Sequence, residues 1–328
     1  MTFKTRRKFL GELAFIAGAT PFMSSFKRPS AIPQIGFLNG AGLDELDNAF
    51  TEELKKLGFE ESKTIVIERR FARPNSNDAA GFAQELAKMK LDLIVVSALP
   101  FAIAVRKVNP EMPMVICTCP GMVSNGFAQS LEHPGGIYTG MDELPAGITA
   151  QRLRLLKAAA PNIIQVALLS TTPGIGGHEI QFSEAEKTAP KLGIEVKAYR
   201  ASSFPQLEKA LADIAADKMN GMLNFQGGLS LANRKLIADF AAEHSIPAIY
   251  QATLFAEAGG LMSWAPNLVE QFREAAHYVD KILKGTKPGD LAVQHPSKYY
   301  LTLNLTAAKK IGLTFTQELR SQATKIIS

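Results

Sequence analysis

Short apolar runs alternate with stretches of helical spacing along almost the whole chain. The apolar runs are IPQIGFLNG, KTIVIERRF, LDLIVVSAL, MPMVICTC, IIQVALLST, IEVKAYRAS, GMLNFQGG and IPAIYQA. The stretches of helical spacing include LDELDNAFTEELKKLGF, DAAGFAQELAKMK, FPQLEKALADIAADK and NRKLIADFAAEHS. Apolar strands separated by amphipathic helices build parallel sheets that are covered on both faces. The alternation therefore predicts an α/β fold.

The alternation is interrupted at HPGGIYTGMDELPAG, after which a second series of strands begins. Beyond that series, the helical run LVEQFREAAHYVDKILKG and the strand-like run KYYLTLNL lead into a final helical segment. We expect this tail of the chain to return to both halves. The pattern therefore predicts two Rossmann-like lobes, each a parallel sheet flanked by helices, which are joined by a multi-strand hinge. We expect a leader in residues 1–30, a first lobe from residues 31–140 and 265–290, and a second lobe from residues 141–264 and 291–328.

The N-terminus has the layout of an export signal. Arg6 and Arg7 precede a mostly apolar run, and Glu12 is the first acidic residue. A basic head before a short apolar core is typical of a signal peptide. The order Thr5-Arg6-Arg7-Lys8-Phe9-Leu10 resembles the twin-arginine signal, which is read by a receptor. The alternative is a basic, disordered N-terminus. We expect a periplasmic protein exported by the twin-arginine route.

The net charge of +5 belongs to this leader. Residues 1–30 hold six basic residues and one acidic residue, whereas the rest of the chain holds equal numbers of both. Binding to nucleic acid depends on basic residues that neutralise phosphates. The body of the protein has no overall basic bias, so we do not expect a nucleic-acid partner.

Residue patterns for catalysis or metal binding are scarce. The chain has no HExxH, GxSxG or P-loop lysine motif. The glycines before His178, in PGIGGHE, do not complete the fingerprint GxGxxG because Glu179 stands at the third glycine position. Cys117 and Cys119 lack the further ligands of a zinc site, and we expect them to share one face of a strand as buried thiols. The sequence therefore predicts no enzyme, no cofactor and no metal.

Small hydroxyl and amide side chains follow the predicted strands where each strand ends. In open parallel sheets, ligands bind beyond the carboxyl ends of the strands, where the N–H groups of helix starts point outward. Each residue taken alone is better explained as a helix cap or a turn residue, but the same polar character at six strand ends predicts a ligand cleft. The residues are Asn39, Gly40, Ser97, Ala98, Thr118 and Cys119 in the first lobe, and Thr171, Thr172, Gln226, Gly227, Tyr250 and Gln251 in the second.

Four blocks along the chain point to a known family. They are IGFLNG, SLEHPGGIYTG, IPAIYQATLFAEAGGLMSWAPN and YVDKILKGTKPGDLAVQHPSKYYLTLNLTAAKKIGL. In this order they resemble the ABC-transporter substrate-binding proteins of the tryptophan/tyrosine-uptake type. The resemblance covers almost the whole chain after the leader and implies a periplasmic binding protein of the type I fold. It also implies that a small solute is delivered to a membrane permease and its ATPase.

The resemblance bears on the site as well. Many members have a Gly-Asp-Pro-like turn after the fourth strand, where this chain has Cys119-Pro120-Gly121-Met122. Members often have Ser-Asp after the glycine of the first crossover, where this chain has Asp142 and Glu143, and an aromatic residue where it has Trp264. Packing between the lobes explains Trp264 equally well. We expect an ammonium group of the ligand to face Asp142 or Glu143, its apolar body to lie on Trp264 or Tyr250, and a carboxylate to bind Ser97 or Thr118.

Together these features predict a non-enzymatic, monomeric binding protein for an amino acid or small carboxylate. Two other classes remain open: a sensor subunit that presents its closed form to a membrane receptor, and a secreted α/β enzyme. Neighbouring genes for a permease and ATPase, or for a kinase, would separate uptake from sensing. A turnover assay would reveal an enzyme.

Overall fold

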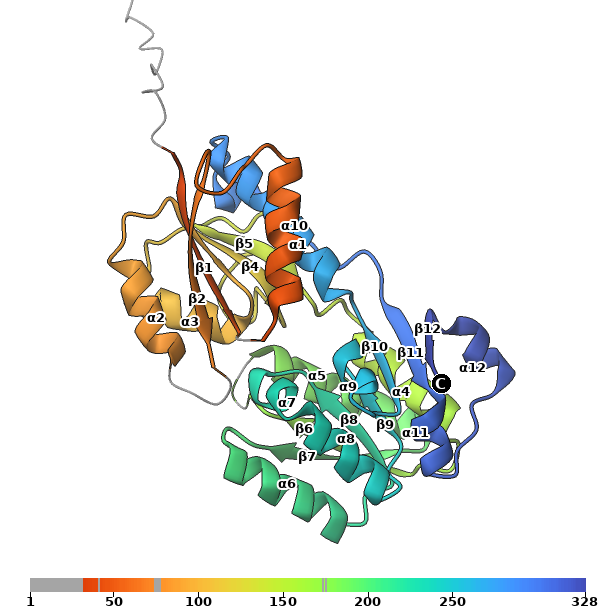
Figure 1. The fold of residues 1–328 in the computed structure, drawn as a ribbon. Helices are drawn as coiled ribbons and strands as arrows, with labels where there is room; N and C mark the ends of the chain where they lie inside the picture. Colours follow the sequence, from red (N-terminus) through yellow and green to blue (C-terminus); the bar gives the residue numbers. More distant parts are fainter. Residues whose placement is uncertain (1–31, 41, 74–77, 173, 175) are drawn as a thin grey trace, which may run out of the picture. The chain divides into compact units, whose positions relative to one another are not determined.

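A computed structural model describes residues 32–40, 42–73, 78–172, 174 and 176–328 (Figure 1). The expected leader, including Arg6 and Arg7, lies outside these residues. Among the described residues, no helix combines the length and the apolar character that a membrane span requires.

The first series of strands forms a five-stranded sheet in the order β2-β1-β3-β4-β5. All four strand pairings are parallel, as predicted. We call the part of the chain that packs on this sheet lobe I. Its elements are β1 (Gln34–Gly40), α1 (Asp44–Lys56), β2 (Val66–Ala72), α2 (Asp78–Ala87), β3 (Leu93–Val96), α3 (Leu99–Val108), β4 (Met114–Cys119), β5 (Tyr138–Asp142), α10 (Leu268–Leu283) and the 3₁₀ turn η2 (Pro288–Asp290).

The second series forms a seven-stranded sheet in the order β12-β11-β10-β9-β8-β6-β7. Its pairings are parallel except for β10 with β11, which is antiparallel. We call this part lobe II. Its elements are α4 (Ile148–Ala159), β6 (Gln165–Ser170), α5 (Gly176–Thr188), η1 (Ala189–Leu192), β7 (Glu195–Arg200), α6 (Phe204–Ala216), β8 (Gly221–Phe225), α7 (Gly228–Ala232), α8 (Arg234–Glu243), β9 (Ala248–Tyr250), α9 (Thr253–Glu257), β10 (Met262–Ala265), β11 (Tyr300–Asn304), α11 (Leu305–Lys310), α12 (Gln317–Gln322) and β12 (Lys325–Ile327).

Helices cover both faces of the lobe I sheet, as the continuous apolar strands require. Helices α1 and α10 lie side by side against one face, and α2 and α3 lie against the other (Figure 1). On the first face the Phe37 ring of β1 stacks on Phe50 of α1 at 5.0 Å and meets Phe272 of α10 edge-on at 6.3 Å. Because α10 comes from the far end of the sequence, this aromatic cluster joins the tail of the chain to lobe I.

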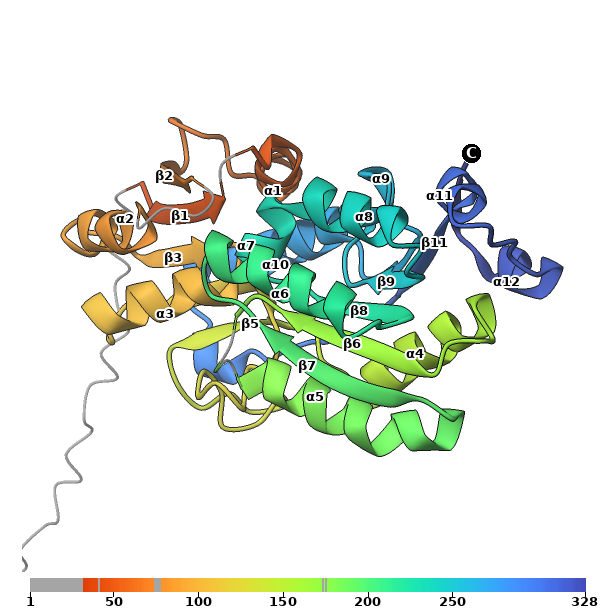
Figure 2. The ribbon, with the colours of Figure 1, turned by 90° about the horizontal axis from the view of Figure 1, so that it is seen from below.

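Lobe II has the same layered construction. Helices α4, α5 and α12 pack on one face of its sheet, and α6, α8 and α9 pack on the other. Figure 2 shows α4 and α5 on one side of the strands β6, β7 and β8. The α/β fold with helices on both faces of mainly parallel sheets is confirmed.

A bulge in β4 changes the direction of one predicted side chain. Ile116 pairs with Gly140 and Cys119 pairs with Asp142, so one extra residue of β4 lies between the two pairs. Cys117 consequently packs with α1 and α10, whereas Cys119 packs with α2 and α3. The expectation that both thiols share one face was wrong because a bulge breaks the two-residue alternation. Gly140 permits the bulge, since a Cβ there would lie 2.1 Å from the Ile116 carbonyl oxygen.

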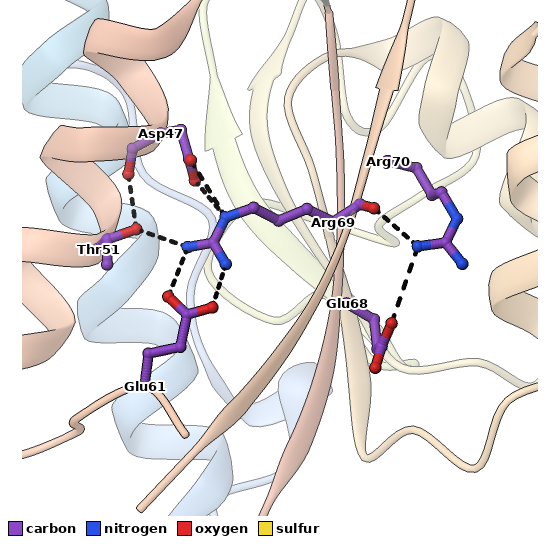
Figure 3. Close-up of polar contacts among 6 residues, drawn as sticks. All are labelled: Asp47, Thr51, Glu61, Glu68, Arg69 and Arg70. Carbon is purple, nitrogen blue, oxygen red and sulfur yellow. Dashed lines mark hydrogen bonds and ion pairs between the residues drawn. The ribbon is translucent and has the colours of Figure 1, made fainter. Parts of the chain in front are cut away.

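The edge strand β2 is held by an arginine network (Figure 3). Arg69 Nε donates to both oxygens of Asp47, on α1, at 3.0 and 3.1 Å. Its terminal nitrogens bind Thr51 of α1 and the carboxylate of Glu61 in the loop before β2. Edge strands expose unpaired backbone groups, and charged side chains along them discourage pairing with another chain. The network therefore fixes the edge of the sheet and does not form a pocket.

Candidate ligand-binding site

The carboxyl ends of the lobe I strands place three predicted polar residues together. Asn39 is fully buried, its Oδ1 accepts from the N–H of Gly40, and its Nδ2 has no hydrogen-bond partner among the described residues. Thr118 Oγ1 donates to the carbonyl oxygen of Ser97 at 2.8 Å. Ala98 precedes α3 as its N-cap and is half-buried. These groups line the end of the sheet with small polar atoms, one of which is an unused amide donor.

The strand ends of lobe II are tied to one another through Thr171. Its Oγ1 accepts from the backbone N–H of Ser230 at 3.2 Å, and the hydroxyl of Ser230 accepts from the N–H of Gly227 at 3.0 Å. A Cβ on Gly227 would lie 2.7 Å from Thr171 Oγ1, so this position requires glycine. Thr172, Gln226 and Gly227 are half-buried, whereas Thr171 is buried.

His178 holds the start of α5 against two strands. The Ser170 hydroxyl lies 2.7 Å from His178 Nδ1, and the carbonyl oxygen of Gln226 lies 3.1 Å from Nε2. Burial lowers the pKa of His178 to about 4, so the ring is neutral, with Nε2 donating and Nδ1 accepting. The side chains of Ser170 and His178 are almost completely buried. This serine–histidine pair therefore joins β6, β8 and α5 and offers no exposed nucleophile.

Asp142, at the end of β5, is committed to the backbone. Its Oδ1 accepts from the N–H groups of Gly121 at 3.1 Å and Leu144 at 2.9 Å, and its Oδ2 accepts from Met122 at 2.8 Å. Hydrogen bonds from three backbone donors stabilise a carboxylate. Asp142 thus fixes the turn after β4 and the start of the crossover to lobe II. Cys119, which begins that turn, has its side chain in the core of lobe I.

Glu143, the next residue, is placed differently. Its Oε1 accepts from Gln271 Nε2 at 3.1 Å, and no described residue donates to its Oε2. Although the residue as a whole keeps some exposure, its carboxyl group is surrounded by protein, and burial raises its pKa to about 7. Of the two acids expected at this crossover, Glu143 is the one whose carboxylate is incompletely hydrogen-bonded.

Arg152, on α4, was not anticipated from the sequence. The residue is 2% exposed, its Nε donates to the carbonyl oxygen of Trp264 at 3.1 Å, and its Nη1 donates to Gln181 Oε1 at 3.4 Å. Burial lowers its pKa to about 10. A signal was present, since position 152 falls on the apolar stripe of α4 with Ile148, Leu155 and Leu156. An arginine on a buried helix face is a candidate for a functional site.

Two aromatic residues differ in their surroundings. Trp264 is half-buried and lies against Tyr299, with ring centroids 4.9 Å apart. Tyr250 is fully buried and stacks on Phe255 at 4.8 Å, within the core that α6, α8 and α9 share with the sheet. Trp264 therefore has a face near the crossovers, whereas Tyr250 is a core residue.

The crossovers bring five side chains into one cluster. Glu143 follows β5, Arg152 lies on α4, Trp264 is the last but one residue of β10, Gln271 lies in the first turn of α10 and Tyr299 precedes β11. Glu143 and Tyr299 are also joined through the Glu143 carbonyl oxygen, which accepts from the Tyr299 hydroxyl at 3.3 Å. We call this set the crossover cluster. It contains both signs of charge, amide groups and a broad aromatic face.

Comparisons with known proteins agree with this architecture. Residues 31–327 match the family model described as ABC transporter substrate binding protein. The "Tyrosine-binding protein" of Clostridioides difficile (strain R20291) is 21% identical over 271 residues, which are 83% of this chain and 77% of that protein. Two solved structures share a TM-score of 0.83 and cover 90% of this chain and 100% of their own: a conserved domain protein from Vibrio cholerae, 24% identical, and an ABC domain from Streptococcus pneumonia in complex with L-Trp, 20% identical. The predicted two-lobed type I periplasmic binding protein fold is confirmed.

Proposed function

We propose that this chain, which belongs to the family of ABC transporter substrate-binding proteins, is exported and captures a small solute between its lobes for delivery to a membrane permease and its ATPase. The observation that carries the proposal is the crossover cluster, where incompletely paired charged groups and an aromatic face meet between the two sheets. Such convergent polar groups beside apolar surface are typical of small-molecule sites. We expect a periplasmic monomer that uses the twin-arginine route.

The proposed solute is an amino acid or a small carboxylate, with an aromatic body as the first candidate. Trp264 offers a broad apolar face, and Glu143 offers an acceptor for an ammonium group. Relatives of this chain are described as binding tyrosine and as holding L-Trp. Further proposed contacts are at the strand ends: Asn39, Gly40, Ser97, Ala98, Thr118, Thr171, Thr172, Gln226 and Gly227.

A binding role without catalysis is supported by the surroundings of Ser170 and His178. Among the described residues, Ser170 and His178 form a hydroxyl–imidazole contact like that of a nucleophile and its base, but both side chains are buried and neutral. Covalent catalysis needs a nucleophile that a substrate can reach.

A thermal-shift screen of amino acids and small carboxylates against the full chain tests the proposal. A solute that binds the native state at a hundredfold excess over Kd adds about 2.7 kcal/mol to the free energy of unfolding. We expect at least one such solute, recovered unchanged after incubation. Failure of every solute, or its chemical conversion, would overturn the proposal.

A further inference from the structure

Arg152 carries a buried positive charge that the described residues do not neutralise. No carboxylate oxygen among them lies within 4.0 Å of a guanidinium nitrogen of Arg152. Glu184 lies nearby, but its oxygens accept from the backbone N–H groups of Thr149 and Ala150. Burying an ionised group without a counter-charge is strongly unfavourable. A buried arginine without an ion-pair partner is therefore expected to meet an anion.

The guanidinium retains donors for such an anion. Its Nε binds the Trp264 carbonyl oxygen and its Nη1 binds Gln181, whereas its Nη2 donates to no described residue. The planar fork of arginine matches a carboxylate better than a lysine ammonium does.

Gln181, on α5, supplies a second donor beside Arg152. Its side chain is completely buried, and its Nε2 has no hydrogen-bond partner among the described residues. Its Oε1 is already shared, because it accepts from Arg152 Nη1 and from Gln251 Nε2. An unpartnered buried amide donor destabilises the folded protein. It therefore marks a place where an acceptor completes the structure.

Glu143 presents the opposite charge on the other side of the cluster. It lies close enough to Arg152 for each to favour the charged form of the other, yet the two do not form an ion pair. A group placed between them would meet an acceptor at one end and donors at the other. Trp264 lies beside this pair, since the guanidinium carbon of Arg152 lies 5.9 Å from its ring centroid.

We propose that the solute is an α-amino acid held at both charged ends, with its carboxylate on Arg152 and Gln181 and its ammonium on Glu143. The inference rests on the proposed function and narrows it from amino acids and carboxylates to zwitterions. Arg152 then determines specificity through the carboxylate, and Glu143 through the ammonium. Asp142 takes no part, because its oxygens are held by backbone N–H groups.

The test begins with calorimetric titration of the full chain with the twenty standard L-amino acids and with small carboxylates. We expect an amino acid to bind most tightly, and its decarboxylated amine and its deaminated acid to bind at least about 30-fold more weakly. Binding of no solute would sink the proposed function itself. Binding of a simple carboxylate or a neutral solute, and of no amino acid, would leave that function standing and overturn this inference.

Two variants separate the ends of the ligand. Arg152→Gln should weaken binding of the amino acid at least about 30-fold but leave binding of the decarboxylated amine unchanged. Glu143→Gln should weaken the amino acid similarly and leave the deaminated acid unchanged. A purely structural role would weaken all three ligands together, so that result overturns the inference. Arg152→Lys keeps the positive charge but loses the planar fork of donors. Its affinity for the amino acid should lie between those of the wild type and Arg152→Gln.

The matched control is Arg154→Gln, because Arg154 is an exposed arginine on the same helix. It should bind every ligand as the wild type does. If Arg152→Gln proves unstable, Gln181→Leu gives an independent test, since it removes the second donor without removing the charge. Amino-acid affinity within threefold of wild type in both Arg152→Lys and Gln181→Leu would contradict the carboxylate assignment.

Discussion

Gly177 of α5 lies directly against Pro120, the first residue after β4. A Cβ placed on Gly177 would stand 1.8 Å from the Pro120 carbonyl oxygen, and a Cβ placed on Gly121 would stand 3.3 Å from the Gly177 Cα. Pro120 belongs to the turn that Asp142 fixes, and Gly177 neighbours His178, which is anchored to two strands of lobe II. Because both backbone segments are held by hydrogen bonds within their own lobes, neither can move away from the other by itself. The contact between Pro120 and Gly177 therefore joins lobe I to lobe II, and only glycine fits at position 177.

Replacing Gly177 by alanine should therefore push the two lobes apart at this point and weaken solute binding at least about tenfold. Real Cβ atoms do not tolerate a 1.8 Å approach to an oxygen, so the backbone must move. Titration calorimetry measures the affinity. The control is Gly81→Ala on α2, where an added Cβ meets nothing within 4 Å and should stabilise the helix by up to about 1 kcal/mol. Equal affinities in Gly177→Ala and wild type would show that this contact is not needed in the bound state.

Asp142→Asn should reduce stability more than affinity. The amide replaces one of the two oxygens, so at least one of the backbone N–H groups of Gly121, Met122 and Leu144 loses its acceptor. An unsatisfied buried donor costs about 1–3 kcal/mol, measurable by urea denaturation. Glu143→Gln should show the reverse pattern, with a large loss of amino-acid affinity. If Asp142→Asn lost affinity and kept its stability, Asp142 would be the ligand's partner in place of Glu143.

Stability should fall as the pH rises through the range in which Glu143 ionises. Burial raises its pKa from 4.5 to about 7 in the folded protein. Between these values the unfolded chain has lost the proton and the folded protein has kept it, so rising pH favours unfolding, and the effect levels off above pH 7. Relative to Glu143→Gln, the free energy of unfolding of the wild type should fall by at most roughly 3 kcal/mol between pH 4.5 and pH 7.5. Urea titrations at both pH values give the difference, and a constant difference would contradict the raised pKa.

Bound solute should reverse this pH effect. The groups that surround Glu143 are Arg152, Gln271, Tyr299 and the neighbouring Asp142. An ammonium group placed beside the carboxylate lowers its pKa, so binding releases a proton between pH 5 and pH 7, and amino-acid affinity rises with pH. Calorimetry in two buffers of different ionisation enthalpy counts the protons. Proton uptake on binding would count against the predicted pairing.

The arginines of β2 should differ in their contribution to stability. The two side chains are about equally buried, but Arg69 makes several hydrogen bonds to Asp47, Thr51 and Glu61 (Figure 3). Arg70 pairs with Glu68 and Glu85, whose side chains are more exposed than that of Asp47. We expect Arg69→Gln to cost about 2–3 kcal/mol because a charged network is broken. Arg70→Gln should cost at most about 1 kcal/mol. Chemical denaturation of both variants measures this, and equal losses would mean that Arg69 acts as an ordinary surface residue.

Export should depend on the arginine pair at the N-terminus. Changing both Arg6 and Arg7 to lysine keeps the charge but removes the pair that the twin-arginine receptor reads. We expect the variant to stay in the cytoplasm, as measured by cell fractionation, while Lys4→Arg is exported normally. Normal export of the double-lysine variant would indicate a general secretory signal.

The sequence by itself determined the layers of this protein. Apolar runs such as LDLIVVSAL and helical runs such as FPQLEKALADIAADK fix the local period of burial, and that period is enough to predict strands, helices and parallel sheets. It also indicated which polar residues follow the strands, because strand ends can be read from the chain.

Only the tertiary structure decided which side chains meet there. Asp142 and Glu143 are neighbours with the same chemistry, and their roles differ because the turn after β4 comes back to Asp142 alone. Cys117 and Cys119 lie on opposite faces because β4 has a bulge between Ile116 and Cys119. The bulge depends on Gly140 of β5, a strand that follows much later in the chain and pairs with Ile116. Arg152 became part of the crossover cluster because Trp264 of β10 and Gln181 of α5, from distant parts of the chain, accept its hydrogen bonds. Local periodicity predicts which residues are buried. Which residues they contact depends on the pairing of segments that are distant in the sequence.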